Sequence, residues 1–450
     1  MIKDPILEMY ELYDLVDKKN MRSVQERIKS YNVVDIALFL ETLNHLQALA
    51  VFRILPKDIA TEVFSFFNQE TQEEFISLMT NAELTNLVEN LYIDDVVDMV
   101  EDLPEDVVAR VLKNVRKDRR DIINRFLQYK EDSAGSIMTG EFISVKRDMT
   151  VAETIEKVRR EGSDVESIYT VYVTNEKSEL EGYISVKTLL TNDPNLLISG
   201  LLSEDIISVH TDTDQEEVAK IISKYDLVSV PVLDNQAKLV GIVTIDDAVD
   251  VLELEATEDI QKIAAMTPLE DKYLDSSIFV LAKNRIGWLL FLMISATFTG
   301  LIIEKYEALL IAYAGLMAFV PMLTDTGGNA GSQSSTMIIR GISLGEIKNS
   351  DFIKVFSKEL LVGLLTGIIL AVVNSVRMII MYPGEMRMSI VVSLTLIATV
   401  VMSKTIGGLL PIAAKALKMD PAVMAAPLIT TIVDSLSLLV YFFFVRMILM

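Results

Sequence analysis

Carboxylates are the side chains in this sequence whose type and spacing suit chemistry, and their densest run begins at residue 246. Its members are Asp246, Asp247, Asp250, Glu253, Glu255, Glu258 and Asp259. On a helix, acids three and four residues apart share a face and repel one another. Few lysines balance them before Lys262, and Mg²⁺ prefers such hard oxygen ligands. We therefore predict a divalent-cation site on this segment; a solvated helix is the alternative interpretation.

A different kind of acid, Asp434, lies deep inside the apolar run 421–445. A carboxylate at bilayer depth costs about 2.5–3.5 kcal/mol, so it normally faces protein or water. Polar residues recur around it at steps of three and four, which places them on one helical face. They are Pro427, Thr430, Thr431, Ser437 and Tyr441. Pro427 would also free the carbonyl of Val423 as an oxygen ligand. We interpret this face as a cation path; a buried structural acid is the alternative.

Residues 321–334 form a second polar cluster, PMLTDTGGNAGSQS, at the end of another apolar run. The segment is too rich in glycine for a plain helix, and its flanks are too apolar for an ordinary loop. Small residues allow membrane helices to approach closely. The Gly-Lys-Ser/Thr ending of a phosphate-binding loop is missing, so we expect no nucleotide here. Asn374, in a further apolar run, is interpreted as an inter-helix hydrogen-bonding residue.

Five apolar runs after residue 275 are candidates to cross a bilayer, at about 1.5 Å of rise per residue. They are 286–303, 308–324, 360–376, 388–403 (continuing past Lys404) and 421–445. Basic residues are concentrated before the first run, between the second and third, and between the fourth and fifth. The positive-inside rule then puts the N-terminal half in the cytosol and the C-terminus outside. This pattern predicts a multi-pass protein in the lipid of the cell membrane.

Charge is divided unevenly along the chain, whose formal net charge is −23. From Ser276 onward, 13 basic and 9 acidic residues give +4, and the remaining 28 basic and 55 acidic residues give −27. Such acidity argues against nucleic acid as a partner, because phosphates would be repelled. With no cysteine and two histidines, thiolate chemistry and a His-rich transition-metal site are excluded. We find no ATPase motif and no nucleophile–base set, and predict that the chain is not an enzyme.

The first 130 residues have the pattern of short amphipathic helices. Two of these helices are expected to begin at the Leu-Pro pairs 55–56 and 103–104. Proline suits a first helical turn, and the acids that follow it suit a helix N-terminus.

An internal repeat follows, in which Ile-Ser-Val at 143–145 recurs at 207–209. Each copy continues with a helical run, a β-rich run, a glycine-led strand (182–185 or 241–244) and a further helix. This β-α-β-β-α order resembles a tandem pair of cystathionine-β-synthase (CBS) regulatory domains. Such pairs often hold adenine nucleotides, with Thr or Ser followed three residues later by Asp at the ribose. Thr244 and Asp247 fit that pattern, whereas Ser185 is followed by Thr188.

The chain as a whole resembles the MgtE family of magnesium channels. The order of its segments carries the resemblance, together with DTGGN at 325–329, ATED at 256–259, and the set Asp420, Pro421, Pro427 and Asp434. The resemblance implies a homodimer whose pore lies between the second and fifth spans of both subunits. It implies Mg²⁺ as transported and regulatory ion. It allows ATP in the CBS pair, although Lys187, Thr188 and Thr170 weaken the nucleotide pocket.

The resemblance also assigns roles to individual acids. Asp434 matches the acid that holds hydrated Mg²⁺ in the pore. At the pore mouth, where the connecting (plug) helix ends, the matching acids are Asp420, Glu258 and Asp259. Two further acids that match cation ligands are Glu216 and Glu255. Ligands shared between the CBS pair and the helical domain are matched on the CBS side by Asp214, Asp226, Asp247 and Asp250, and on the helical side by Glu62, Asp94 and Asp98.

We therefore expect a multidomain membrane protein, with an all-α N-terminal helical domain at 1–130 and an α/β tandem CBS pair at 131–200 and 201–250. An acidic plug helix at 251–275 and a five-helix α transmembrane domain at 276–450 would follow. Mg²⁺ bound to the acids before the membrane would close the channel, and their repulsion at low Mg²⁺ would open it for uptake. The alternatives are a broader divalent-cation transporter for Mn²⁺ or Co²⁺, a non-transporting membrane Mg²⁺ sensor, and a CBS-regulated channel for another solute.

Overall fold

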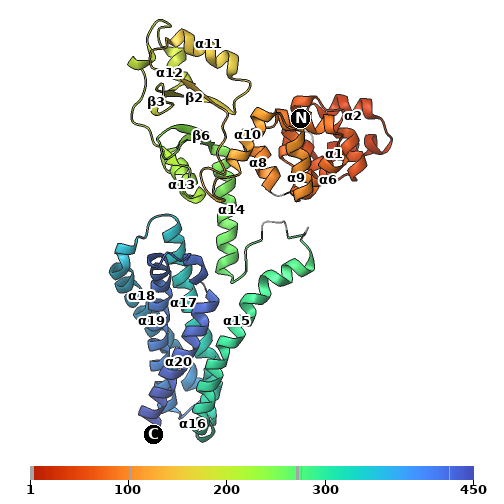
Figure 1. Ribbon diagram of the computed structural model, residues 1–450. Helices are drawn as coiled ribbons and strands as arrows, with labels where there is room; N and C mark the ends of the chain where they lie inside the picture. Colours follow the sequence, from red (N-terminus) through yellow and green to blue (C-terminus); the bar gives the residue numbers. More distant parts are fainter. Residues whose placement is uncertain (1–4, 102, 270–272, 275, 425) are drawn as a thin grey trace. The chain divides into compact units, whose positions relative to one another are not determined.

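The computed structural model describes residues 5–101, 103–269, 273–274, 276–424 and 426–450 (Figure 1). The chain divides into two compact units, Met1–Leu252 and Glu253–Met450. The first unit contains short helices followed by two small sheets, and the second consists of long apolar helices.

Short helices separated by tight turns form the beginning of the first unit. They are α1 (Pro5–Asp17), α2 (Met21–Ile28), α3 (Val33–Glu41), α4 (His45–Phe52), α5 (Lys57–Ser65), α6 (Gln69–Leu78), α7 (Asn81–Asn90), α8 (Ile93–Glu101), α9 (Glu105–Asn114) and α10 (Lys117–Phe126). Asn32, Asn44 and Asn68 cap three of them by accepting a backbone N–H of the first turn. α5 and α9 begin directly after Pro56 and Pro104, so both expected helix starts are confirmed.

The internal repeat folds as two matching α/β modules, as expected. The first has β1 (Phe142–Val145), α11 (Val151–Glu161), β2 (Ser167–Thr174), β3 (Leu180–Ser185) and α12 (Val186–Thr191); the second has β4 (Val209–His210), α13 (Gln215–Tyr225), β5 (Ser229–Leu233), β6 (Leu239–Thr244) and α14 (Ile245–Ile263). In each sheet the first strand pairs parallel with the second, and the second pairs antiparallel with the third. The register matches too: Val171 lies opposite Ile184, and Val230 opposite Val243.

The connecting helix α14 starts directly after β6 and is shorter than the sequence suggested. It was expected to reach residue 275, but it ends at Ile263. Ala265 adopts a positive φ of 53°, which the α-helix does not allow, and the side-chain oxygen of Gln261 accepts the N–H of Leu269 at 2.7 Å. Residues 270–272 and 275 of the predicted segment lie outside the described residues.

In the second unit, four helices among the described residues are long and apolar enough to cross a membrane. They are α15 (Ile278–Lys305), α18 (Phe352–Met381, preceded by a short 3-10 turn), α19 (Met386–Ala416) and α20 (Ala426–Leu449). α19 continues past Lys404, as expected. The expected number of five spans is not confirmed, because the second apolar run is divided among α16 (Glu307–Ala312), a 3-10 segment (Ala314–Phe319) and the start of α17 (Val320–Ser343).

The glycine-rich cluster at 321–334 lies inside α17, so the expectation that it would not be a plain helix was wrong. Its glycines permit close packing between α17, α19 and α20, which lie side by side (Figure 1). A Cβ at Gly327 would collide with Thr399, and one at Gly407 would overlap the carbonyl oxygen of Gly331. The packing gained at these positions outweighs the weak helix propensity of glycine, about 1 kcal/mol per residue.

Replacing Gly407 by alanine should therefore separate α17 from α19. We expect Gly407→Ala to lower the unfolding free energy by about 1–3 kcal/mol, the usual cost of overpacking, measured by thermal unfolding of the detergent-solubilised chain. Gly287→Ala on α15 is the matched control, because a Cβ there meets nothing within 4 Å. Equal stability of the two variants would contradict the packing argument.

Candidate metal centres

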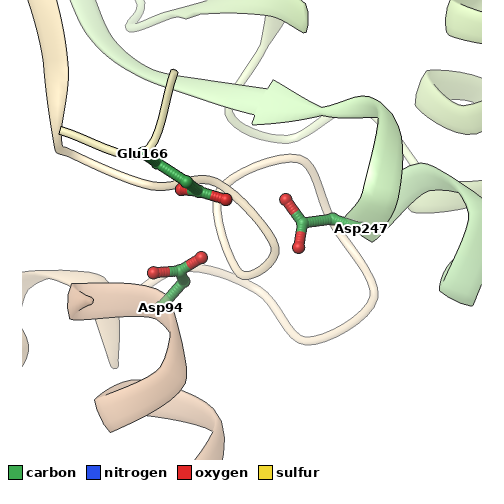
Figure 2. A group of neighbouring side chains, drawn as sticks. All are labelled: Asp94, Glu166 and Asp247. Carbon is green, nitrogen blue, oxygen red and sulfur yellow. The ribbon is translucent and has the colours of Figure 1, made fainter. Parts of the chain in front are cut away.

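Three carboxylates converge in the first unit, each from a different segment (Figure 2). Asp94 lies in the first turn of α8, Glu166 directly precedes β2, and Asp247 lies in the first turn of α14. One oxygen from each lies within 4.8 Å of the others. We call this group the three-acid cluster.

Local hydrogen bonds hold the three-acid cluster in place. The hydroxyl of Thr244 hydrogen-bonds to Asp247 and lies 3.4 Å from Glu166 Oε1. A neighbouring acid, Glu141, accepts the N–H of Ile93 at 3.3 Å and the hydroxyl of Thr139 at 2.9 Å. One oxygen of Asp94 and one of Glu166 are buried without a hydrogen-bond partner. Buried polar groups are normally satisfied, so these two oxygens indicate room for a ligand.

Burial and mutual repulsion make the three-acid cluster hold protons more tightly than isolated acids would. Burial, followed by repulsion from Glu166, raises the pKa of Asp94 well above its ordinary value. Burial and the charge of Asp247 raise the pKa of Glu166 to about 8. Burial raises the pKa of Asp247 to about 6. Burial also raises the pKa of Asp95, the residue after Asp94, to about 6. Each of these carboxylates is therefore unfavourable as an anion unless a positive charge joins it.

A divalent cation fits this arrangement. Mg²⁺ binds oxygens at about 2.0–2.1 Å, so opposite ligands of one ion stand about 4.2 Å apart. The three oxygens all lie within 4.8 Å of one another, so direct binding of all three needs a contraction of the site, and water molecules can take the place of direct ligands. The donors are all carboxylate oxygens, which are typical ligands for Mg²⁺ or Ca²⁺.

A second group of acids lies in the second unit, at the end of α14. Lys262 contacts Glu258 Oε1 at 2.5 Å and Asp420 Oδ2 at 2.7 Å. Asp259 accepts the hydroxyl of Ser343 at 3.2 Å. Although burial alone would lower it, the hydrogen bonds with Asp420 and Glu258 raise the pKa of Lys262. Three predicted ligands are thus gathered here, with a lysine between two of them.

In the apolar helices, Asp434 on α20 is partly buried and is influenced electrostatically by Asp325 on α17. The proposed oxygen ligand at Val423 is not supported, because α20 begins at Ala426. Pro427 therefore stands in the first turn, where its missing N–H frees no helical carbonyl. Its own carbonyl accepts the hydroxyls of Thr430 and Thr431 at 2.8 and 3.0 Å.

The remaining polar residues around Asp434 have different environments. Tyr441 donates its hydroxyl to the carbonyl of Leu316 at 2.9 Å, and Ser437 is fully buried. Asn374 lies 3.5 Å from the hydroxyl of Ser393 on α19, consistent with its predicted inter-helix role. The predicted polar face is therefore partly structural.

A buried lysine in these helices is connected to an acid through a serine hydroxyl. Lys404 is 7% exposed, and its ammonium lies 3.5 Å from the hydroxyl of Ser334. That hydroxyl donates to Glu359 at 2.6 Å. The three residues connect α17, α18 and α19.

The other predicted ligands have local helix contacts or lie on helix surfaces. Asp214 caps α13 by accepting the N–H of Glu216, Glu216 pairs with Lys220 at 2.5 Å, and Asp226 ends the same helix with a φ of 51°. Glu62 and Asp98 are exposed on α5 and α8, and Asp250 is exposed on α14, where Glu255 is partly buried. The structure thus unites Asp94 with Asp247, and Asp420 with Glu258.

Four contributors were missed from the sequence: Glu166, Asp95, Asp325 and Lys262. Asp325 stands in the quoted DTGGN motif, and Lys262 lies one helical turn after Glu258, so both carried a usable signal. Glu166 is a single acid before a strand, and only tertiary structure brings it to Asp94.

Comparison with known proteins gives consistent matches over the chain. Residues 320–444 match the divalent cation transporter family, 31–132 the MgtE intracellular N domain, and 134–194 and 198–254 the CBS domain. The magnesium transporter MgtE of Thermus thermophilus is 34% identical over 441 residues, covering 97% of this chain and 98% of that protein. The magnesium transporter MgtE of Bacillus subtilis is 31% identical over 424 residues, covering 94% and 93%.

Among the solved structures that resemble the chain are two from magnesium transport proteins. The soluble part of a magnesium transporter has a TM-score of 0.54 and 29% identity, over 56% of this chain and 100% of its own. The cytosolic domain of the Mg²⁺ channel MgtE in complex with ATP has a TM-score of 0.52 and 32% identity, over 54% of this chain and 99% of its own.

An acidic helical domain and CBS pair, followed by apolar helices that carry carboxylates, define a divalent-cation transporter. This chain belongs to the MgtE family of magnesium transporters.

The raised pKa values predict how stability depends on pH when divalent ions are removed. An acid whose pKa is higher in the folded than in the unfolded chain binds extra protons when folded, so its contribution is full at low pH and is lost as pH rises through the folded pKa. The window runs from about pH 4 to about pH 8, the value for Glu166. At roughly 1.4 kcal/mol per pKa unit, the effect amounts to a few kcal/mol.

Hydrogen exchange of the full chain in EDTA checks this. After correction for intrinsic exchange rates, amides of α8 should be better protected at pH 5.5 than at pH 8, and Mg²⁺ should restore protection at pH 8. Glu166→Gln should flatten the profile, whereas Glu156→Gln, an exposed acid on α11, should not. Protection independent of pH would contradict the assignment.

Proposed function

We propose that this chain is a Mg²⁺ channel or transporter that mediates magnesium uptake and is closed by Mg²⁺ on the cytosolic side. The observation that carries the transport step is Asp434 on the apolar helix α20 with Asp325 on the adjacent helix α17. Among the described residues, no lysine or arginine forms an ion pair with either acid. Two uncompensated carboxylates in an apolar unit attract a cation, and magnesium-transporting relatives support Mg²⁺ as that cation.

The three-acid cluster supports the regulatory step. A cation bound by Asp94, Glu166 and Asp247 stabilises the conformation that joins their three segments, by an amount that grows with ion concentration. Without the ion, the carboxylates repel and that conformation loses its advantage. We propose Glu258, Asp259, Glu255 and Asp420 as a second set of regulatory ligands, on and near the end of α14. We keep as further regulatory ligands the dispersed acids Glu62, Asp98, Asp214, Glu216, Asp226 and Asp250.

We also propose a homodimer in the lipid of the cell membrane, with the first unit cytosolic and the C-terminus outside. The distribution of basic residues supports this topology. α15 supports contact with lipid or a second copy, because it is highly apolar and none of its residues is buried within the chain.

The alternative functions differ in the residues that each would need. A broader divalent-cation transporter would carry Mn²⁺ or Co²⁺ through the same acids. A sensor that does not transport would use the three-acid cluster but not Asp434. A CBS-regulated channel for an anion would need an uncompensated intramembrane cation, and the buried Lys404 is linked to Glu359 through Ser334.

No step of this proposal uses ATP, although one structural relative was solved with it. In the first CBS module the expected ribose carboxylate is replaced by Thr188, whose hydroxyl bonds Ser185 at 2.8 Å. In the second, Asp247 belongs to the three-acid cluster. The ribose pattern is therefore missing from the first module, and in the second its carboxylate is shared with the three-acid cluster.

Removing the pore acid tests transport. Asp434→Ala should reduce Mg²⁺ uptake at least tenfold, because the cation loses its carboxylate at bilayer depth, while Mg²⁺ binding by the first unit persists. Rescue of a magnesium-requiring strain, with competition by Mn²⁺ and Co²⁺, measures this. Glu304→Gln, an exposed acid at the end of α15, is the control and should transport normally. Normal uptake by Asp434→Ala would favour the sensor alternative.

Weakening the three-acid cluster tests regulation. Asp247→Asn should raise the Mg²⁺ concentration that half-protects residues 130–269 from proteolysis by roughly tenfold, equivalent to about 1.4 kcal/mol of ion binding. Asp212→Asn, an exposed acid in the same module, should leave it unchanged. The gating proposal fails if Mg²⁺ does not alter cleavage of the unsubstituted chain.

A further inference from the structure

The ammonium group of Lys262 lies where the second acid group would hold a cation. Glu258 precedes it by one turn on α14, and Asp420 follows α19 in the chain. The two N···O distances are 2.5 and 2.7 Å. An ammonium group has three donors and no acceptor, so it can serve both carboxylates at once.

These contacts join two segments that are far apart in sequence. Asp420 Oδ1 accepts the N–H of Ala422 at 2.8 Å, which orients the carboxylate and leaves Oδ2 for Lys262. Ile263 packs against Ile339 and Ala422 directly beside the pair. The charged contact is therefore built into the packing between the end of α14 and the turn before α20.

The environment favours this contact over an ordinary surface pair. The Lys262 side chain is 23% exposed, and Glu258 and Asp420 are each 35% exposed, so solvent screening is reduced compared with a fully exposed pair. A cation tethered by its own side chain also acts at a high effective concentration. With Asp259 nearby, one lysine offsets only part of the local negative charge.

We propose that Lys262 is a tethered counter-ion that holds the end of α14 against the Asp420 segment when no divalent ion is present, and that competes with the divalent ion for Glu258 and Asp420. The second part rests on the proposed function, whereas the first does not. A divalent ion must displace Lys262 to bind both acids directly. Lys262 thereby lowers the affinity of this group for Mg²⁺ and keeps part of the closed contact at low Mg²⁺.

The cysteine-free chain allows a direct test. Ile263→Cys with Ala422→Cys places one thiol on each side of the contact, and a short bifunctional thiol reagent reports how often they meet in the full-length protein in membranes. In EDTA, cross-linking should be fast with Lys262, at least fivefold slower in Lys262→Met, and close to the original rate in Lys262→Arg. Lys283→Met, an exposed lysine on α15, is the matched control and should not slow it.

Adding Mg²⁺ separates the two parts of the proposal. In Lys262→Met it should restore cross-linking to close to the parent rate, because Mg²⁺ then takes the place of the missing ammonium group between Glu258 and Asp420. If cross-linking of Lys262→Met stays slow after Mg²⁺ is added, the tether role of Lys262 is supported. The same result would overturn the competition between Lys262 and Mg²⁺, and with it the metal role of Glu258 and Asp420. An unchanged rate for Lys262→Met in EDTA would overturn the proposal.

A double variant tests whether the slow cross-linking of Lys262→Met comes from misfolding. Removing an acid with the lysine relieves the repulsion, so Glu258→Gln with Lys262→Met should cross-link faster in EDTA than Lys262→Met alone and should no longer respond to Mg²⁺. If the double variant is as slow as Lys262→Met, repulsion between the acids is not the cause and the counter-ion role is wrong.

Discussion

Repulsion between carboxylates partly removed from water is the interaction on which the rest of this structure depends. Asp94, Glu166 and Asp247 lie within 4.8 Å of one another, and burial with this repulsion raises the pKa of Glu166 to about 8. Buried charges are normally paired, because an uncompensated one is strongly destabilising. A fold that gathers three of them is therefore stable only with bound protons or cations. A divalent cation that binds this cluster near neutral pH therefore competes with protons for the same carboxylates.

The backbone alone cannot relieve this repulsion. Asp94 and Asp247 both stand in the first turn of a helix, where the helix dipole favours an anion by about 0.3–1 kcal/mol. Burial nevertheless raises the pKa of Asp247 to about 6, so the helix terminus does not offset the loss of solvation. The helix termini position the carboxylates without neutralising them. The end of α14 has a different solution, since Lys262 supplies a cation to two of its acids.

Local patterns predicted the elements well, and tertiary contacts explain most of what they missed. The repeat located the strands of both CBS modules, because its strand–helix order is encoded within each copy. The same reasoning found Asp94 and Asp247 but not Glu166, whose place beside them follows from packing between separate segments. It also misread 321–334, because glycine propensity is local whereas the contact of Gly407 with Gly331 is not. The early end of α14 depends on Gln261, which binds the backbone of a later residue.

The apolar helices hold two different arrangements of charged side chains, and the difference between them supports the proposed cation path. Lys404 is linked through Ser334 to Glu359, so that group carries little net charge and has little reason to attract an ion. Asp434 is repelled electrostatically by another acid, Asp325. Among the described residues, neither acid has a basic ion-pair partner. Like charges on neighbouring apolar helices are unfavourable until a cation approaches them. The second arrangement is therefore the one from which transport is expected.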